Sequence, residues 1–310
     1  MRETFVTLAT GLMGIGKSYI TEQMVRAYAK AHPKRSILIF DPNFEESWNK
    51  FPAIHFDIME IQRAKKEEAK KGIRIVTQSE KNLKKLPPGI FIIAPFTVYK
   101  EPMNQPQMLL TMVTICTNYR GGMCLLEDVN KYTISFEKTE IQSAFKAIRH
   151  SSVDYIIHLQ SLNPIRPVIF EATRLIRMHY DGFDLYKIKE KISQYFTICR
   201  IAQIIINTKY RKGEEITRKY PNWEQNPKLK QVVNAYKRLF IWVFTKDEYI
   251  TGVKKEDFIL ACNEYLTESP SEYKPQLQKI LFLQNRKSPT LNDHNEARAN
   301  WIREHWRYYR

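Results

Sequence analysis

The most constraining feature of the sequence is an octapeptide near its start, Gly11–Ser18, which reads GLMGIGKS. It satisfies the pattern G-x-x-x-x-G-K-[ST], in which glycines let successive backbone N–H groups point inward around a phosphate. An apolar run precedes the octapeptide, and a stretch with apolar residues at helical spacing follows it. We therefore expect a β-strand, a phosphate-binding loop (P-loop) and a helix whose N-terminus faces a bound nucleotide.

The side chains of this loop have expected roles toward ATP and Mg²⁺. Lys17 would bridge the β- and γ-phosphates, and Ser18 would hold Mg²⁺ through its hydroxyl. The residues expected to bind the nucleotide are Gly11, Gly14, Ile15, Gly16, Lys17, Ser18 and Tyr19. A glycine-rich turn without a ligand is the simpler alternative, but the flanking strand and helix patterns favour nucleotide binding.

The periodicity of the chain predicts an α/β fold. Residues 1–182 alternate apolar runs (5–9, 36–40, 74–77, 90–94, 123–126, 155–159) with helical patterns (17–31, 107–119, 138–150), as in a mainly parallel sheet with crossover helices. Residues 183–310 predict helices around 184–210, 228–237, 255–266, 271–285 and 295–309, with a small hairpin of 239–245 and 249–253. We expect a P-loop NTPase core with a mainly parallel sheet flanked by helices, plus a basic, helix-rich C-terminal region.

Two acids close the apolar run 123–126, where a P-loop hydrolase needs them. One carboxylate orients Mg²⁺ and a second polarises the attacking water, and ionised groups beside a core are costly unless they are paired or on a metal. We assign Glu127 to the metal and Asp128 to the water. The reverse assignment stays open, because motor enzymes usually carry the order Asp-Glu. Plain surface acids at a strand end are the alternative.

Gln160 closes the next apolar run, 155–159. A polar side chain at the carboxyl end of a strand beside the P-loop strand can hydrogen-bond the γ-phosphate or the attacking water. Gln160 alone is a weak signal. Together with the P-loop and the acid pair, it predicts a hydrolytic site.

The charge balance points to a polyanionic partner. Lys+Arg number 49 against 33 Asp+Glu, for a formal net charge of +16, and such a surplus attracts nucleic acid or an acidic membrane face. Solubility alone is the simpler explanation. The sequence shows neither a secretory signal nor an apolar run of about 20 residues, so we expect a soluble, cytoplasmic protein without a transmembrane segment. The four scattered cysteines favour reduced thiols over a disulfide framework or a zinc site.

The order of these motifs resembles the FtsK–HerA superfamily of DNA-pumping ATPases, over about residues 4 to 180. Within it, the sequence is most similar to viral genome-packaging ATPases and to zonula-occludens-toxin-like assembly ATPases of filamentous phages. The segments that carry the resemblance are Gly11–Ser18, Asp41–Asn43, Glu127–Asp128, Arg149–His150 and Gln160. The missing transmembrane segment favours packaging over filamentous extrusion.

The resemblance implies an ATP-hydrolysing homo-oligomer, commonly a hexameric ring, that pumps DNA through a central pore. It also implies an arginine finger from the neighbouring subunit, because a planar guanidinium neutralises charge on the transferred phosphoryl group. Arg149 matches that position, with Arg166 and Arg174 as rivals. The same resemblance implies capsid or portal vertex proteins as partners, and an association with the virion.

The C-terminal segment 295–310 interleaves arginines with aromatic residues, a composition suited to single-stranded nucleic acid. The aromatic residues also fall roughly on one helical face, which would equally dock on the protein's own core. A second basic candidate surface comprises Arg211, Lys212, Arg218, Lys219 and Lys228.

Other functional classes remain as alternatives. A small-molecule P-loop kinase would not need a charge of +16, and a GTPase would need Asn-Lys-x-Asp, whereas residues 130–133 read NKYT. A nucleotide-gated scaffold that hydrolyses ATP poorly is kept open by the Glu-Asp order.

Overall fold

The computed structural model describes residues 4–131, 139–148, 151–163 and 167–309 of the 310-residue chain. Two compact units make up the chain, Met1–Arg174 and Leu175–Arg310. The sequence pattern predicts the boundary between the two domains near residue 182.

The first unit is built on five parallel strands. In spatial order they are β3 (Gly89–Ile93), β2 (Ser36–Phe40), β4 (Met123–Leu126), β5 (Asp154–Leu159) and β1 (Val6–Thr10). Every residue of β1, β2, β4 and β5 is buried, because a parallel sheet covered on both faces needs near-continuous apolar runs. The carboxyl ends of all five strands therefore lie at one edge, which is where ligands bind in such sheets.

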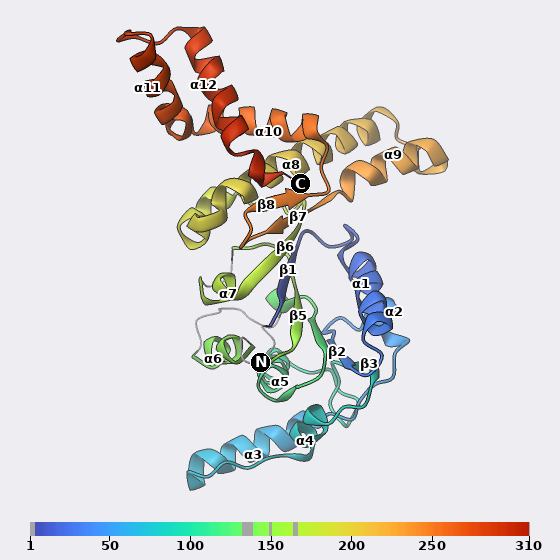
Figure 1. The fold of residues 1–310 in the computed structure, drawn as a ribbon. Coiled ribbons are helices and arrows are strands. Elements are labelled where there is room, and N and C mark those ends of the chain that lie inside the picture. Colours follow the sequence, from blue (N-terminus) through green and yellow to red (C-terminus); the bar gives the residue numbers. More distant parts are fainter. Residues whose placement is uncertain (1–3, 132–138, 149–150, 164–166, 310) are drawn as a thin grey trace. The chain divides into compact units, whose positions relative to one another are not determined.

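Helices cover both faces of this sheet. They are α1 (Lys17–Ala31), α2 (Glu46–Asn49), α3 (Ile58–Lys71), α4 (Gln78–Lys84), α5 (Gln105–Asn118), α6 (Thr139–Ile148), α7 (Pro167–Ala172) and the short 3₁₀ helix η1 (Val129–Lys131). Figure 1 shows α1 on one side of the sheet, and α5 and α6 on the other. On the α1 side, Val25 and Trp48 pack with Ile37, Ile39 and Leu125 in one buried cluster. This cluster fixes α1, and with it the P-loop, against the sheet.

The strand expected at residues 74–77 is wrong, because this segment is not a strand in the structure. Its backbone groups are satisfied by side chains instead of by a neighbouring strand. The N–H of Ile75 donates to Glu68 at 2.7 Å, and the N–H of Thr77 donates to Glu80 at 2.9 Å. Thr77 and Glu80 form the capping box that begins α4. Residues 74–77 (RIVT), although rich in residues that favour strands, thus form a connection that ends in the cap of α4.

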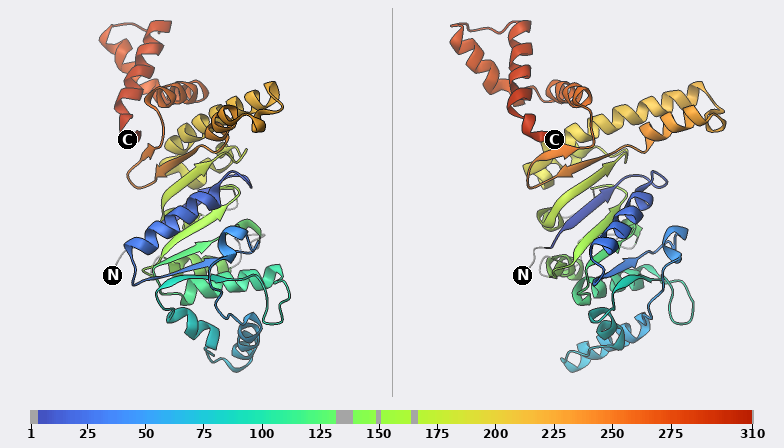
Figure 2. Two further views of the ribbon diagram at one scale, coloured as in Figure 1. Left: turned by 90° about the vertical axis from the view of Figure 1, so that its right-hand side faces the viewer. Right: turned by 45° about the vertical axis from the view of Figure 1, so that its right-hand side comes forward.

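The second unit combines antiparallel strands with helices. Strand β6 (Thr173–His179) pairs with β7 (Phe240–Phe244), which pairs with β8 (Tyr249–Thr251). The helices are η2 (Leu185–Tyr195), α8 (Phe196–Lys219), η3 (Trp223–Gln225), α9 (Pro227–Lys237), α10 (Lys255–Glu268), η4 (Pro270–Tyr273), α11 (Lys274–Leu283), α12 (Leu291–Glu304) and η5 (Trp306–Tyr308). Helices α8 and α9 lie side by side, as do α11 and α12 (Figure 2). The predicted hairpin is β7–β8.

The predicted helix 184–210 is divided in the structure. The 3₁₀ segment η2 has non-helical backbone at Ile188 and Ile192, and the regular helix α8 begins only at Phe196. The predicted α/β class is confirmed, with a P-loop before α1, a mainly parallel sheet flanked by helices and a helix-rich second unit. No helix in the described ranges is long and apolar enough to cross a membrane.

Candidate nucleotide site

The P-loop curls between β1 and α1 on three glycines. Gly11, Gly14 and Gly16 have φ angles of 142°, 74° and 94°, a region that favours glycine. Gly16 is the N-cap of α1, and no described side chain caps that helix start. The first N–H groups of α1 are therefore available to an anion, and the helix dipole adds positive potential there.

Lys17 lies across the mouth of this loop. Its Nζ donates to the carbonyl oxygens of Gly11 and, at 2.8 Å, of Leu12. The ammonium group is thus held where the sequence places the nucleotide phosphates. Ile15 is buried, Ser18 is half-buried, and the Tyr19 side chain is 65% exposed.

Glu127 follows β4 and is buried, with 3% of its surface exposed. Its Oε1 accepts a hydrogen bond from the indole N–H of Trp48 at 3.0 Å, and its Oε2 lies 2.6 Å from Nδ1 of His158. The other ring nitrogen of His158 lies 2.6 Å from the hydroxyl of Thr21 on α1. His158 in β5 therefore connects the buried acid to the helix that begins at the P-loop.

The surroundings of Glu127 favour its ionised form. Burial alone raises the pKa of a carboxyl group, but His158 and Lys17 attract the carboxylate, and hydrogen bonds from His158 and Trp48 stabilise it. The pKa of Glu127 is consequently lowered from its ordinary value. A buried carboxylate held in its charged form suits the metal-orienting position that the sequence predicts.

Asp128 lies at the partly open end of the same strand. Its φ is 41°, unusual for a residue other than glycine. One carboxylate oxygen accepts from the amide of Gln160 at 3.3 Å, and the other accepts from the amide of Asn43 at 3.4 Å. Lys131 donates to the side-chain oxygen of that Asn43 at 2.8 Å. The adjacent strands β4 and β5 thus bring together Asp128 and Gln160, two residues that the sequence predicts for hydrolysis.

Gln160 is further positioned through its backbone. Its N–H donates to the side-chain oxygen of Asn130 at 3.0 Å, and Asn130 belongs to η1, directly after the acid pair. The side chain of Gln160 is exposed. Strand β5 lies between β1, which leads into the P-loop, and β4, which leads into the acid pair. Gln160 directly follows β5 and is therefore placed between these two motifs.

Asp41 is a second buried acid at this edge, beside Glu127, and its sequence pattern predicted no role for it. Its carboxylate accepts from the N–H of Asn43 at 2.8 Å and from the N–H of Glu45 at 2.5 Å. Burial and the nearby negative charges of Glu127 and Glu45 outweigh these bonds and raise the pKa of Asp41 to about 6. The signal available in the sequence was an apolar run ending in an acid, the same pattern as at β4.

Sequence reasoning also missed His158, Trp48 and Thr21. The one visible sign was His158, a polar residue inside the apolar run 155–159. Arg149 and Arg166 lie outside the described residues, and Arg174 lies in β6.

The donor set fits Mg²⁺ held together with a nucleotide. Within the described ranges, no cluster of three His, Cys, Asp or Glu residues is able to hold a metal ion by itself. Mg²⁺ is usually bound by one or two carboxylates together with substrate phosphates and water. Ser18 at the P-loop and the ionised Glu127 after β4 would supply the protein part of such a site.

Comparisons with known proteins find likeness in fold. No family model matches the chain, and no curated protein sequence matches it. Among solved structures, the chain is similar to the genome-packaging NTPase B204 from Sulfolobus turreted icosahedral virus 2, bound to AMP. The match has 17% sequence identity, covers 82% of this chain and 99% of that chain, and has a TM-score of 0.43. It is also similar to B204, the DNA-packaging ATPase from Sulfolobus turreted icosahedral virus, with 16% identity, 81% and 97% coverage and a TM-score of 0.43.

A further similar structure is a KaiC-like protein from Pyrococcus horikoshii, with 15% identity, 57% and 74% coverage and a TM-score of 0.30.

Proposed function

We propose that the chain is an ATP-driven nucleic-acid translocase of the viral genome-packaging type. One observation carries the proposal: the P-loop, the acid pair and Gln160 follow the adjacent parallel strands β1, β4 and β5, and Gln160 is hydrogen-bonded to Asp128. Phosphate binding, a metal-orienting acid and a water-orienting pair are the parts that ATP hydrolysis requires.

In this proposal each residue has a defined task. Lys17 and the α1 N-terminus bind the β- and γ-phosphates, while Ser18 and Glu127 hold the metal and its water shell. Bound Mg²⁺ would neutralise charge that develops between these phosphates. Asp128 orients and polarises the attacking water, and Gln160 donates to the water or to the γ-phosphate.

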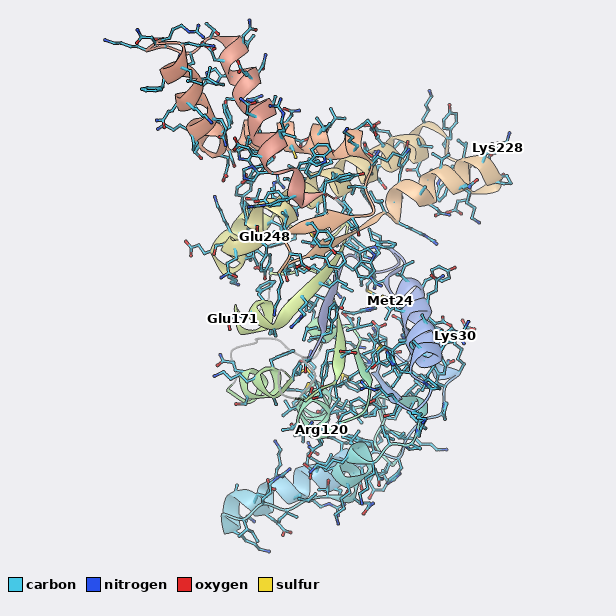
Figure 3. The ribbon with its side chains drawn as sticks, viewed as in Figure 1. Met24, Lys30, Arg120, Glu171, Lys228 and Glu248 are labelled. Atoms are coloured by element: carbon cyan, nitrogen blue, oxygen red, sulfur yellow. The ribbon has the colours of Figure 1, made fainter. Side chains whose placement is uncertain are left out.

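The α8–α9 helix pair supports a polyanionic partner. Six of its cations take part in no ion pair within the described chain: Arg211, Lys212, Arg218, Lys219, Lys228 and Lys230. Lys228 lies at the far end of the pair, as Figure 3 shows. Unpaired cations along a helix pair contact phosphates without reading sequence. We infer that α8 and α9 contact nucleic acid, most simply DNA.

A motor of this type works as a ring of identical subunits, most simply a hexamer. Its arginine finger would come from the neighbouring subunit, with Arg149 as our first choice and Arg166 and Arg174 as rivals. Capsid or portal vertex proteins are the partners that a packaging ring would engage. A zonula-occludens-toxin-like assembly ATPase is the related alternative.

A second candidate function is a nucleotide-gated scaffold with little turnover. It is favoured by the partners of Glu127, because both of its oxygens already face protein donors. It is also favoured by the shorter Asp128 at the water-polarising position. The scaffold and the motor bind ATP alike and differ in turnover.

Steady-state ATP hydrolysis with and without single- and double-stranded DNA tests the proposal. Lys17→Ala is expected to abolish turnover, whereas Lys30→Ala, at the exposed far end of the same helix, is expected to leave it unchanged. DNA-stimulated, Lys17-dependent hydrolysis supports the motor. Tight ATP binding without hydrolysis would favour the scaffold, and hydrolysis indifferent to every nucleic acid would favour a small-molecule kinase or a partner-gated ATPase.

A further inference from the structure

A groove of about 590 Å³ lies in the second unit, between α10 and the C-terminal helices α12 and η5. Its volume is in the range of ligand pockets, which span about 300–1,000 Å³. Apolar side chains from both sides line it: Ile259 from α10, and Ala299 and Ile302 from α12. This lining offers a flat aromatic group an apolar contact surface.

Three cations line the same groove, and no carboxylate side chain among the described residues does. Lys255, Arg298 and Arg303 contribute to its lining, and none of them forms an ion pair within the described chain. Arg298 and Ile302 share a face of α12 because they are spaced four residues apart, as do Ala299 and Arg303. The groove therefore combines a local surplus of positive charge with an apolar lining.

Arg298, which contributes to the lining of the groove, carries a buried donor without an acceptor. Its Nε is buried without a hydrogen-bond partner in the described structure, and its guanidinium lies 5.3 Å from the centre of the Tyr273 ring. A buried guanidinium N–H without an acceptor is unfavourable. The remaining guanidinium N–H groups of this lining residue suit phosphate oxygens.

The groove also contains the features that recognise bases. The Trp306 ring lines it, and Asn263 and Asn295 present amide groups to it. Aromatic rings stack on bases of any sequence, and amides hydrogen-bond base edges. Trp301 and Tyr308, by contrast, are buried, so the aromatic residues of this segment divide between the protein's own core and the groove.

We propose that the α10–α12 groove binds a nucleotide unit of single-stranded nucleic acid, with phosphate on Lys255, Arg298 and Arg303 and a base beside Trp306. The inference rests on the proposed function only in taking the polymer to be nucleic acid. A free nucleotide shares this chemistry and is separated from the polymer by the test below.

Binding of a fluorescein-labelled oligo(dT) of about 15 nucleotides to the full chain, without ATP and over a series of salt concentrations, tests the proposal. The double variant Lys255→Gln/Arg303→Gln alters exposed side chains and is expected to weaken binding at least ten-fold. Its salt slope should fall by about 1.4, because each phosphate contact on a single strand contributes about 0.7. Lys279→Gln, an exposed lysine on α11 outside the groove, is the matched control and should bind within two-fold of the unaltered chain.

Intrinsic fluorescence provides a second readout that does not depend on charge. Trp306 packs edge-on against Phe258, so Trp306→Phe keeps an aromatic ring there and removes the indole signal. Oligo(dT) should quench the fluorescence of the unaltered chain, and Trp306→Phe should lose most of that quenching.

Three outcomes would overturn the proposal. The first is unchanged affinity and salt slope in the double variant, which would leave the groove to another ligand such as an acidic peptide. The second is quenching that persists in Trp306→Phe. The third is equal competition by millimolar AMP and by unlabelled oligo(dT) at the same nucleotide concentration, which would indicate a free-nucleotide site. ATP hydrolysis measured on the same proteins keeps failure of the groove distinct from failure of the motor.

Discussion

The buried hydrogen bond from Trp48 to Glu127 gives the sharpest test of how this site is held. The Trp48 side chain is fully buried on α2, and its indole N–H lies 3.0 Å from the acid. Trp48→Phe removes that donor and keeps an aromatic ring. Glu127→Gln removes the charge and keeps the shape. Together the two changes define a double-mutant cycle.

The magnitude follows from burial. A hydrogen bond to a charged group contributes about 1.5–3 kcal/mol, and the smaller ring leaves a void that costs about 1 kcal/mol more. Trp48→Phe should therefore destabilise the protein by about 2.5–4 kcal/mol at pH 7. A glutamine at 127 accepts more weakly, so the coupling between the two changes should be about 1–2 kcal/mol.

Urea unfolding of the four proteins, followed by far-UV circular dichroism, measures this coupling. The pKa of Glu127 is lowered in the folded state, so the stability from its ionised form is present above its ordinary pKa and is lost as pH falls. The cost of Trp48→Phe should accordingly shrink in acid. A coupling below about 0.5 kcal/mol, the usual error of additivity, would refute the reasoning, as would a cost independent of pH.

Three further outcomes are expected. The pKa of Asp41 is raised to about 6 from its ordinary value of 3.8. The stability that its protonated form provides is therefore present below pH 3.8 and is lost as pH rises through 6. Asp41→Asn should flatten this pH dependence and raise the free energy of unfolding at pH 8 by as much as about 3 kcal/mol, measured by unfolding across pH. A Cβ at Gly213 would lie 2.9 Å from Lys237 and 3.2 Å from Tyr236, so Gly213→Leu should cost about 1–3 kcal/mol in chemical unfolding and weaken DNA binding, while DNA-free hydrolysis stays unchanged. Gln160→Ala should lower turnover about 10²-fold with ATP affinity within about two-fold; an equal loss of affinity would contradict its expected role.

Local motifs predicted the parts of the fold that depend on local chemistry. The P-loop needs glycines at fixed spacing, and Gly11, Gly14 and Gly16 all have positive φ. The buried parallel strands appear in the sequence as unbroken apolar runs, so their positions follow directly. Asp128 and Gln160 were each placed at a strand end, and pairing of β4 with β5 brings them together.

Contacts between distant segments could not be predicted in this way. His158 lies 31 residues after Glu127 and 137 after Thr21, and only the strand order places it between them. Trp48 reaches the same acid from a four-residue helix with no distinctive pattern. The α10–α12 groove likewise depends on how two helices pack, although the basic and aromatic composition of residues 295–310 pointed to its chemistry.

ATP-dependent displacement of streptavidin from the end of a biotinylated DNA tests the claim of translocation most directly. The assay responds to force along the polymer and not to hydrolysis alone. The account predicts displacement that requires ATP, is lost in Lys17→Ala and is strongly reduced in Asp128→Asn. DNA-stimulated hydrolysis without displacement, on either single- or double-stranded DNA, would contradict it.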